Sequence, residues 1–122
     1  MRLACLSTLL IACLAVLSGP LRAFEVEEQI TYEAAQPRSV LRVVSTADRD
    51  AFEPIILAFQ AENPTVTVDY TIAGTSDVMS AIHDDDAVFD LVISSAMDLQ
   101  TKLANDGFAR SYRSAATDAL PD

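Results

Sequence analysis

The sequence predicts an α/β domain built around a mostly parallel, three-stranded sheet. Three apolar runs each precede a segment with helical periodicity, and short polar turns separate them. Strands that alternate with helices in short units are typical of parallel sheets with right-handed crossovers. Between residues 40 and 110 the expected order is therefore β-α-β-α-β-α.

The first unit combines a strand at residues 40–44 with a helix at residues 50–62. The strand is predicted by a run of β-branched and apolar residues. Asp50 and Glu53 have the spacing of a capping box at the helix start, and Asn63-Pro64 ends the helix. One apolar face of this helix, at positions i, i+3, i+4 and i+7, comprises Phe52, Ile55, Ile56 and Phe59.

The second and third units repeat this arrangement. The second strand alternates between apolar and polar side chains, and Thr75 or Ser76 is the expected N-cap of the helix that follows. The third helix is expected to end at Gly107. The predicted strands of these units are residues 65–72 and 89–94, and the predicted helices are residues 77–83 and 97–105.

Residues 1–23 have the layout of a secretory signal peptide. Arg2 precedes an apolar stretch, Gly19-Pro20 interrupts it, and Ala23 provides a small residue for cleavage. The apolar stretch is shorter than the ~20 residues of a membrane-spanning helix. Cleavage would release the protein into the periplasm. An uncleaved anchor and lipid attachment at Cys13 are the alternatives.

The rest of the chain divides into three regions. Residues 24–39 are predicted to be an irregular acidic lead-in, in which Ile30 and Tyr32 have the character to dock on the domain. Residues 40–110 form the α/β domain, and residues 111–122 are predicted to be an irregular C-terminal tail.

The acidic composition restricts the expected partners. All 18 acidic residues lie after residue 23 with six of the eight basic ones, which gives this part a net charge of −12. The phosphates of nucleic acid would be repelled, so nucleic acid is not an expected partner. Both cysteines lie in the leader, so no disulfide or cysteine metal site is expected beyond it.

Three strand-to-helix turns carry hydroxyl groups, and the carboxyl ends of parallel strands meet at one edge of a sheet. A helix start presents unpaired N–H groups and positive partial charge, which suits an anion or a polar ligand. The expected edge is neutral to slightly positive, and helix capping is the alternative role for each hydroxyl. The candidate ligand-binding residues are Ser45, Thr46, Thr75, Ser76 and Ser95.

No catalytic or metal-binding pattern stands out. His83 and the following run of aspartates are expected to form a solvated helix end, and Asp90 is an isolated carboxylate. No nucleophile elbow, Walker loop or dinucleotide fingerprint is present. We therefore predict a protein that is not an enzyme and has no catalytic residue, metal or cofactor.

Several segments in order resemble bacterial extracellular solute-binding proteins. They are Leu41-Arg42-Val43-Val44-Ser45-Thr46, then Phe52-Glu53-Pro54 through Phe59-Gln60-Ala61-Glu62-Asn63-Pro64, and Val66-Thr67-Val68-Asp69-Tyr70. Residues 90–107 resemble the subgroup that includes ferric-iron and phosphoglycerate-type binding proteins. The resemblance extends from residue 40 to about residue 121.

The resemblance implies a partial lobe of the type II periplasmic binding fold, in an N-terminal fragment of the substrate-binding component of an ABC importer. Such a protein captures a small polar or anionic solute between two lobes and delivers it to an inner-membrane permease. The tyrosine pair that holds iron in ferric-binding members has no match among Tyr32, Tyr70 and Tyr112, so the resemblance does not extend to iron. The alternative is a stand-alone periplasmic sensor or interaction domain built from the same half-lobe; the oligomeric state is not predicted.

Overall fold

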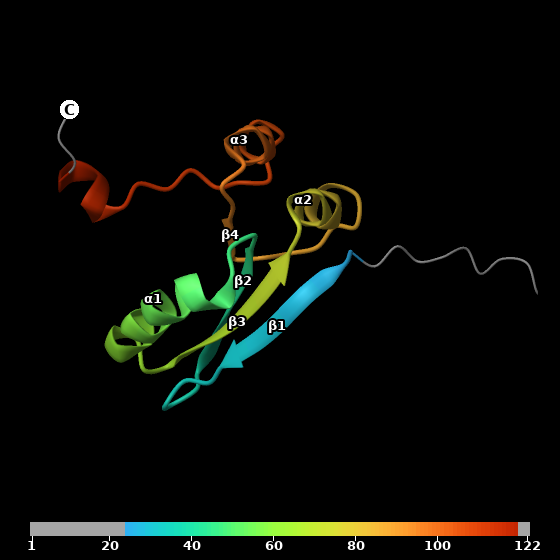
Figure 1. Ribbon diagram of the computed structural model, residues 1–122. Helices are drawn as coiled ribbons and strands as arrows, with labels where there is room; N and C mark the ends of the chain where they lie inside the picture. Colours follow the sequence, from blue (N-terminus) through green and yellow to red (C-terminus); the bar gives the residue numbers. More distant parts are fainter. Residues whose placement is uncertain (1–23, 120–122) are drawn as a thin grey trace, which may run out of the picture.

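A computed structural model describes residues 24–119 of the chain. Its centre is a mixed sheet of four strands in the order β1-β3-β2-β4 (Figure 1). The predicted signal peptide, its predicted cleavage after Ala23 and the alternative of lipid attachment at Cys13 concern residues outside this range. The strands are β1 (Val26–Tyr32), β2 (Ser39–Ser45), β3 (Val66–Ala73) and β4 (Leu91–Ile93).

The three predicted strands form the parallel part of the sheet. β2 lies in the middle and pairs in parallel with β3 on one side and with β4 on the other. Val43 lies opposite Tyr70 of β3 and opposite Leu91 of β4. The predicted parallel pairing of these three strands is therefore confirmed for this part of the sheet.

The prediction of an irregular lead-in at residues 24–39 is wrong for β1, which adds a fourth, antiparallel strand beside β3. Ile30 lies opposite Tyr70, and the hydroxyl of Thr31 donates a 2.8 Å hydrogen bond to Asp69. Ile30 and Tyr32 pack against the core while the residues around them stay exposed. Because only these two side chains turn inward, the apolar alternation that marks a strand is short and follows a glutamate-rich start.

The helices are α1 (Arg49–Glu62), α2 (Thr75–His83) and α3 (Met97–Asn105), close to the predicted ranges. Their N-caps are Asp48, Gly74 and Ala96, and none makes a side-chain capping hydrogen bond. The expected capping box and the expected Thr75 or Ser76 cap are therefore wrong. In the tail, a short 3₁₀ helix η1 spans Ala115–Ala119. Within residues 24–119 no helix is both long and apolar enough to cross a membrane.

The core consists of two clusters on opposite faces of the sheet. α1 covers one face, whereas α2 and α3 gather on the other side near the ends of the parallel strands (Figure 1). Tyr70 is fully buried in the first cluster, where its ring stacks on Phe52. The buried members are Val43, Ile56, Val68, Tyr70 and Ile72 under α1, and Val44, Ala73, Val78, Ile82 and Leu103 under α2 and α3.

Only about half of the predicted apolar face of α1 is buried. Ile56 is buried and Phe52 is partly buried against the sheet. Ile55 remains 58% exposed and Phe59 37% exposed. α1 packs mainly across β3, and Leu91 of β4 remains 46% exposed.

Candidate functional site

The strand-to-helix turns after β2, β3 and β4 lie at one edge of the sheet, which we call the rim: residues 45–48, 74–77 and 94–96. Ser45 at the end of β2 lies opposite Ile72 of β3 and opposite Ile93 of β4. The backbone N–H of Thr46 donates to the carbonyl of Ile93 at 3.0 Å, which ties the first turn to the third. The parallel pairing thus brings the three predicted turns together, as the sequence indicated.

The turns after β2 and β4 share one local structure. The Ser45 hydroxyl accepts a 3.0 Å hydrogen bond from the N–H of Ala47, and the Ser94 hydroxyl accepts a 3.1 Å hydrogen bond from the N–H of Ala96. Such bonds from a hydroxyl to the backbone two residues on fix a turn. Ser45 is fully buried and shapes its turn from beneath, whereas Ser95 in the middle of the other turn is exposed.

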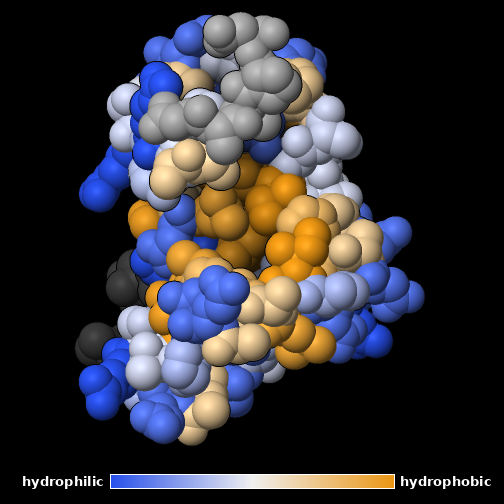
Figure 2. Space-filling view, turned by 90° about the vertical axis from the view of Figure 1, so that its left-hand side faces the viewer, coloured by the Kyte–Doolittle hydropathy of each residue, from blue (hydrophilic) through white to orange (hydrophobic). Residues whose placement is uncertain are grey.

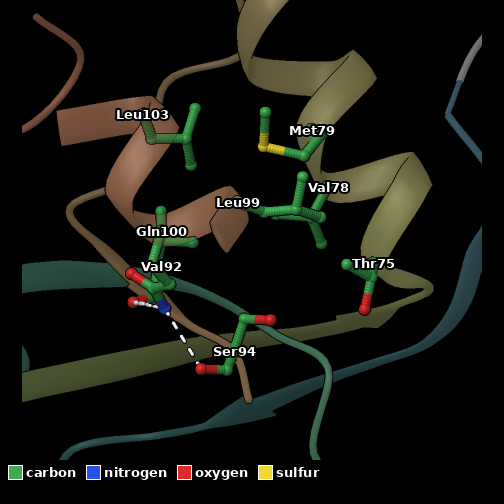
Figure 3. Close-up of a pocket in the computed structure, with 8 residues that line it drawn as sticks. All are labelled: Thr75, Val78, Met79, Val92, Ser94, Leu99, Gln100 and Leu103. Atoms are coloured by element: carbon green, nitrogen blue, oxygen red, sulfur yellow. Dashed lines mark hydrogen bonds between the residues drawn. The ribbon is translucent and has the colours of Figure 1, made fainter. Parts of the chain in front are cut away.

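A small hollow lies between α2 and α3, and two of the residues that line it carry hydroxyl groups. Thr46 donates to the Ser94 hydroxyl at 3.4 Å, and Ser94 lines this hollow together with Thr75 (Figure 3). Ser76 is exposed in the first turn of α2. The remaining lining is largely apolar and comprises Val78, Met79, Val92, Leu99, Gln100 and Leu103.

This hollow is too small for a solute. It encloses about 10 Å³, which is room for about one water molecule. A solute could therefore not be enclosed between α2 and α3.

Tyr70, which sequence reasoning placed only in a strand, supports the rim from the core. Its hydroxyl donates a 3.0 Å hydrogen bond to the carbonyl of Ala47. Burial raises the pKa of Tyr70, and a hydrogen bond with the Ser45 hydroxyl partly offsets this effect. The phenol is therefore protonated over the ordinary pH range and holds the turn after β2 as a neutral donor.

Gln100 of α3 has a similar supporting position that the sequence did not reveal. Its side-chain N–H group lies 3.5 Å from the carbonyl oxygen of Val92 and 3.4 Å from that of Ser94 (Figure 3). Both distances are at the long end for hydrogen bonds, so the amide holds the turn after β4 loosely.

Carboxylates give one end of the rim a negative charge, which corrects the expectation of a neutral to slightly positive edge. An open depression of about 230 Å³ lies between α1 and β1. Its one basic side chain, Arg49, contacts Glu28 at 3.3 Å, Glu53 at 3.8 Å and Asp50 at 3.9 Å. The residues lining the depression are Glu27, Glu28, Asp48, Arg49, Asp50 and Ile72.

The same negative charge continues to the start of α2. A Cβ atom added to Gly74 would lie 2.9 Å from the Asp77 carboxylate and 3.7 Å from that of Glu27. Asp50, Asp77 and Asp98 lie in the first turns of α1, α2 and α3. Acidic groups there offset the positive partial charge that would attract an anion. Sequence reasoning missed Glu27 and Glu28 because they come from β1.

The residues weighed for metal binding and catalysis have structural partners. His83 lies 3.4 Å from the carboxylates of both Asp84 and Asp106, and so links the ends of α2 and α3. Among residues 24–119 no group of three potential metal ligands occurs. Asp90 accepts hydrogen bonds from the backbone and side chain of Arg42, which lower its pKa and keep it ionised.

The sequence pattern shared by one family of bacterial extracellular solute-binding proteins matches residues 41–120. The match extends from the third residue of β2 beyond η1 and so includes all three turns of the rim. The chain belongs to this family. Membership of this family implies that the protein is secreted or periplasmic. The family is characterised by solute binding and not by catalysis. None of the curated proteins matches the chain.

A solved structure supports the same assignment. The chain is similar to the substrate-binding protein of an ABC transporter from Agrobacterium tumefaciens, with 30% sequence identity and a TM-score of 0.72. The similarity covers 81% of this chain and 31% of that protein. The chain therefore spans about a third of the length of this relative. The ferric-iron or phosphoglycerate subgroup has no support beyond the segments that first indicated it.

Proposed function

We propose that the chain provides the solute-contacting first part of a periplasmic substrate-binding protein of an ABC importer. The observation that carries this proposal is the meeting of three turns at one rim, where Thr46, Thr75, Ser76 and Ser95 are only partly buried or exposed. Ser45 shapes the rim from below. An inner-membrane permease is the proposed partner that receives the solute.

The charges of the rim favour a neutral or cationic polar solute over an anionic one. The β1 end of the rim has one guanidinium, that of Arg49, which already contacts three acidic side chains. The carboxylates at this end are those of Glu27, Glu28, Asp48, Asp50 and Asp77. Hydroxyl groups donate and accept hydrogen bonds, so they suit hydroxyls and amines of a solute. An anion would meet like charges at the β1 end of the rim.

The test is a thermal-unfolding titration of the purified chain with four probes: glucose, arginine, phosphate and succinate. We expect glucose or arginine to raise the midpoint of unfolding, because a ligand at about 100 times its Kd stabilises by about 2.7 kcal/mol. Phosphate and succinate are expected to leave the midpoint unchanged at equal ionic strength.

Thr46→Val is the informative variant, because it removes the hydroxyl and keeps the shape of the side chain. Thr65→Val, at the opposite end of the parallel strands, is the matched control. We expect the first variant to lose the ligand-induced shift and the second to keep it. Phosphate or succinate as the only stabilising probe would refute the charge argument, and an unchanged shift in Thr46→Val would refute the rim as the site.

A further inference from the structure

α3 is held to the rest of the domain by few buried side chains. Leu103 is its buried residue, and α2 is the element against which it mainly packs. On the side of the molecule where α1 lies, Figure 2 shows a hollow lined by hydrophobic side chains, and within residues 24–119 α3 does not pack closely on α1. The position of α3, and with it that of the turn after β4, therefore depends on the contacts of α3 with α2.

A polar cluster around His83 joins the C-terminal ends of α2 and α3. The Nδ1 atom of His83 lies 3.4 Å from the carboxylate of Asp84, and its Nε2 atom lies 3.4 Å from that of Asp106 at the end of α3. The Asp106 carboxylate also pairs with Lys102, and the imidazole lies beside the ring of Phe108, with the ring centroids 5.3 Å apart. His83 thus connects α2 to the end of α3 and to the segment that follows it.

Both ring nitrogens of His83 face the oxygen of a carboxylate. A neutral imidazole carries a proton on one nitrogen and a lone pair on the other, so one of the two contacts is then repulsive. In the imidazolium form both nitrogens carry protons, and both contacts become attractions between opposite charges. The connection between α2 and α3 is therefore complete only when His83 is protonated.

The other groups around the imidazole are compatible with a positive charge on it. His83 lies in the last turn of α2, where the negative end of the helix dipole attracts a cation. Asp85 and Asp86 follow in the loop after α2, and both are exposed. Lys102 is the other cation of the cluster, and its ammonium group is offset by its own pairing with Asp106.

We infer that His83 is a proton-operated clamp, which holds α3 against α2 while the imidazole is charged and releases it when the imidazole loses its proton. Histidine is the side chain that ordinarily changes its charge between about pH 5 and pH 8, so the clamp is closed at the acidic end of this range and open at the other. Because Gln100 holds the turn after β4 at long distances, release of α3 would also loosen one side of the rim. This last consequence rests on the proposed function, whereas the clamp itself does not.

The experiment is a double-mutant cycle between His83→Gln and Asp106→Asn in the purified chain, measured by urea denaturation at about pH 5.5 and about pH 8. Asp106→Asn also removes the pairing with Lys102, but it does so in both backgrounds, so that loss cancels in the cycle. We expect a coupling of about twofold to fivefold in the unfolding equilibrium constant at the lower pH, the range of exposed ion pairs, and none at the higher pH. No solute is present, so failure of solute binding at the rim does not affect this result.

A second cycle, between Lys102→Gln and Asp106→Asn, is the matched control. A lysine is charged at both pH values, so we expect this coupling to be about the same at both. The sequence contains one histidine, so the imidazole gives a single NMR signal that reports its protonation directly.

Hydrogen exchange locates the effect within the fold. After correction for the intrinsic exchange rates, amides of α3 are expected to lose protection relative to those of β3 as the pH rises through this range. In His83→Gln the relative protection of α3 should not depend on pH.

Three results would overturn the inference. One is a coupling between His83 and Asp106 that is equal at the two pH values. Another is an imidazole signal that shows the same protonation state at both. The third is a protection of α3, relative to β3, that does not change with pH in the parent chain.

Discussion

The β1 and β4 sides of the sheet differ in strand length and in how deeply their side chains are buried. β1 is seven residues long and lies against β3, whose Tyr70, Val68 and Ile72 are nearly or fully buried. β4 is three residues long and leaves Leu91 46% exposed. The rim is therefore bordered by a well-buried strand on the β3 side and by a short, more exposed strand on the β4 side.

The largest expected effect contrasts a core side chain with an edge side chain. Tyr70→Ala should lower the free energy of unfolding by about 3–5 kcal/mol, because it opens a cavity in the core and removes the hydrogen bond to Ala47. Leu91→Ala should cost only about 1 kcal/mol, because half of the side chain is already in water. Urea denaturation measures both. Equal losses would show that β4 is held as firmly as β3.

The glutamates of β1 are expected to protect this edge of the sheet from pairing with another chain. In the double variant Glu27→Val, Glu28→Val, the strand becomes an apolar edge, so the chain should aggregate at lower concentration or lower temperature than the parent. Static light scattering during heating provides the measurement, with Glu62→Val at the end of α1 as the control. If the onset stays the same, the glutamates are not what protects this edge.

The smallest effect concerns pH and the residue that anchors β4. Hydrogen bonds from Arg42 hold the pKa of Asp90 below its ordinary value. This stabilisation is complete above the unfolded-state pKa of about 4 and is lost as the pH falls through the lowered folded-state pKa. Asp90 is partly exposed, so the contribution should be under about 1 kcal/mol.

Urea denaturation between pH 7 and pH 3 should therefore show a slightly shallower loss of stability in Asp90→Asn than in the parent. Asp106, whose pKa is lowered mainly by its hydrogen bond with Lys102, contributes in the same direction. Asp85→Asn, in the exposed run after α2, serves as the control. A steeper acid dependence in Asp90→Asn would contradict the assigned direction.

Local patterns predicted the elements whose signals lie within a few residues. α3 has the predicted bounds, and Gly107 just beyond it has a φ of 90°, a conformation that glycine adopts without strain and that ends a helix. β1 was not predicted, because its two inward side chains, Ile30 and Tyr32, depend on a partner strand far along the chain. The hydroxyl-bearing turns were predictable because their signals, like those of α3, lie within a few residues of sequence.

The charge of the rim was not predictable in the same way. Asp50 and Asp77 are visible in the sequence as first-turn residues, yet Glu27 and Glu28 reach the rim only because β1 runs antiparallel to β3. The half-covered face of α1 was missed for a related reason. Periodicity identifies Ile55 and Phe59 as apolar-face residues, but it does not reveal how much of the sheet is present to bury them.

The antiparallel pairing of β1 also sets the order in which the fold can be completed. Ile30 lies opposite Tyr70, which is 40 residues further along the chain. β1 therefore cannot pair until β3 has been synthesised. Contacts that are distant in sequence slow folding. The glutamates of β1 keep this strand hydrated until β3 is available to pair with it.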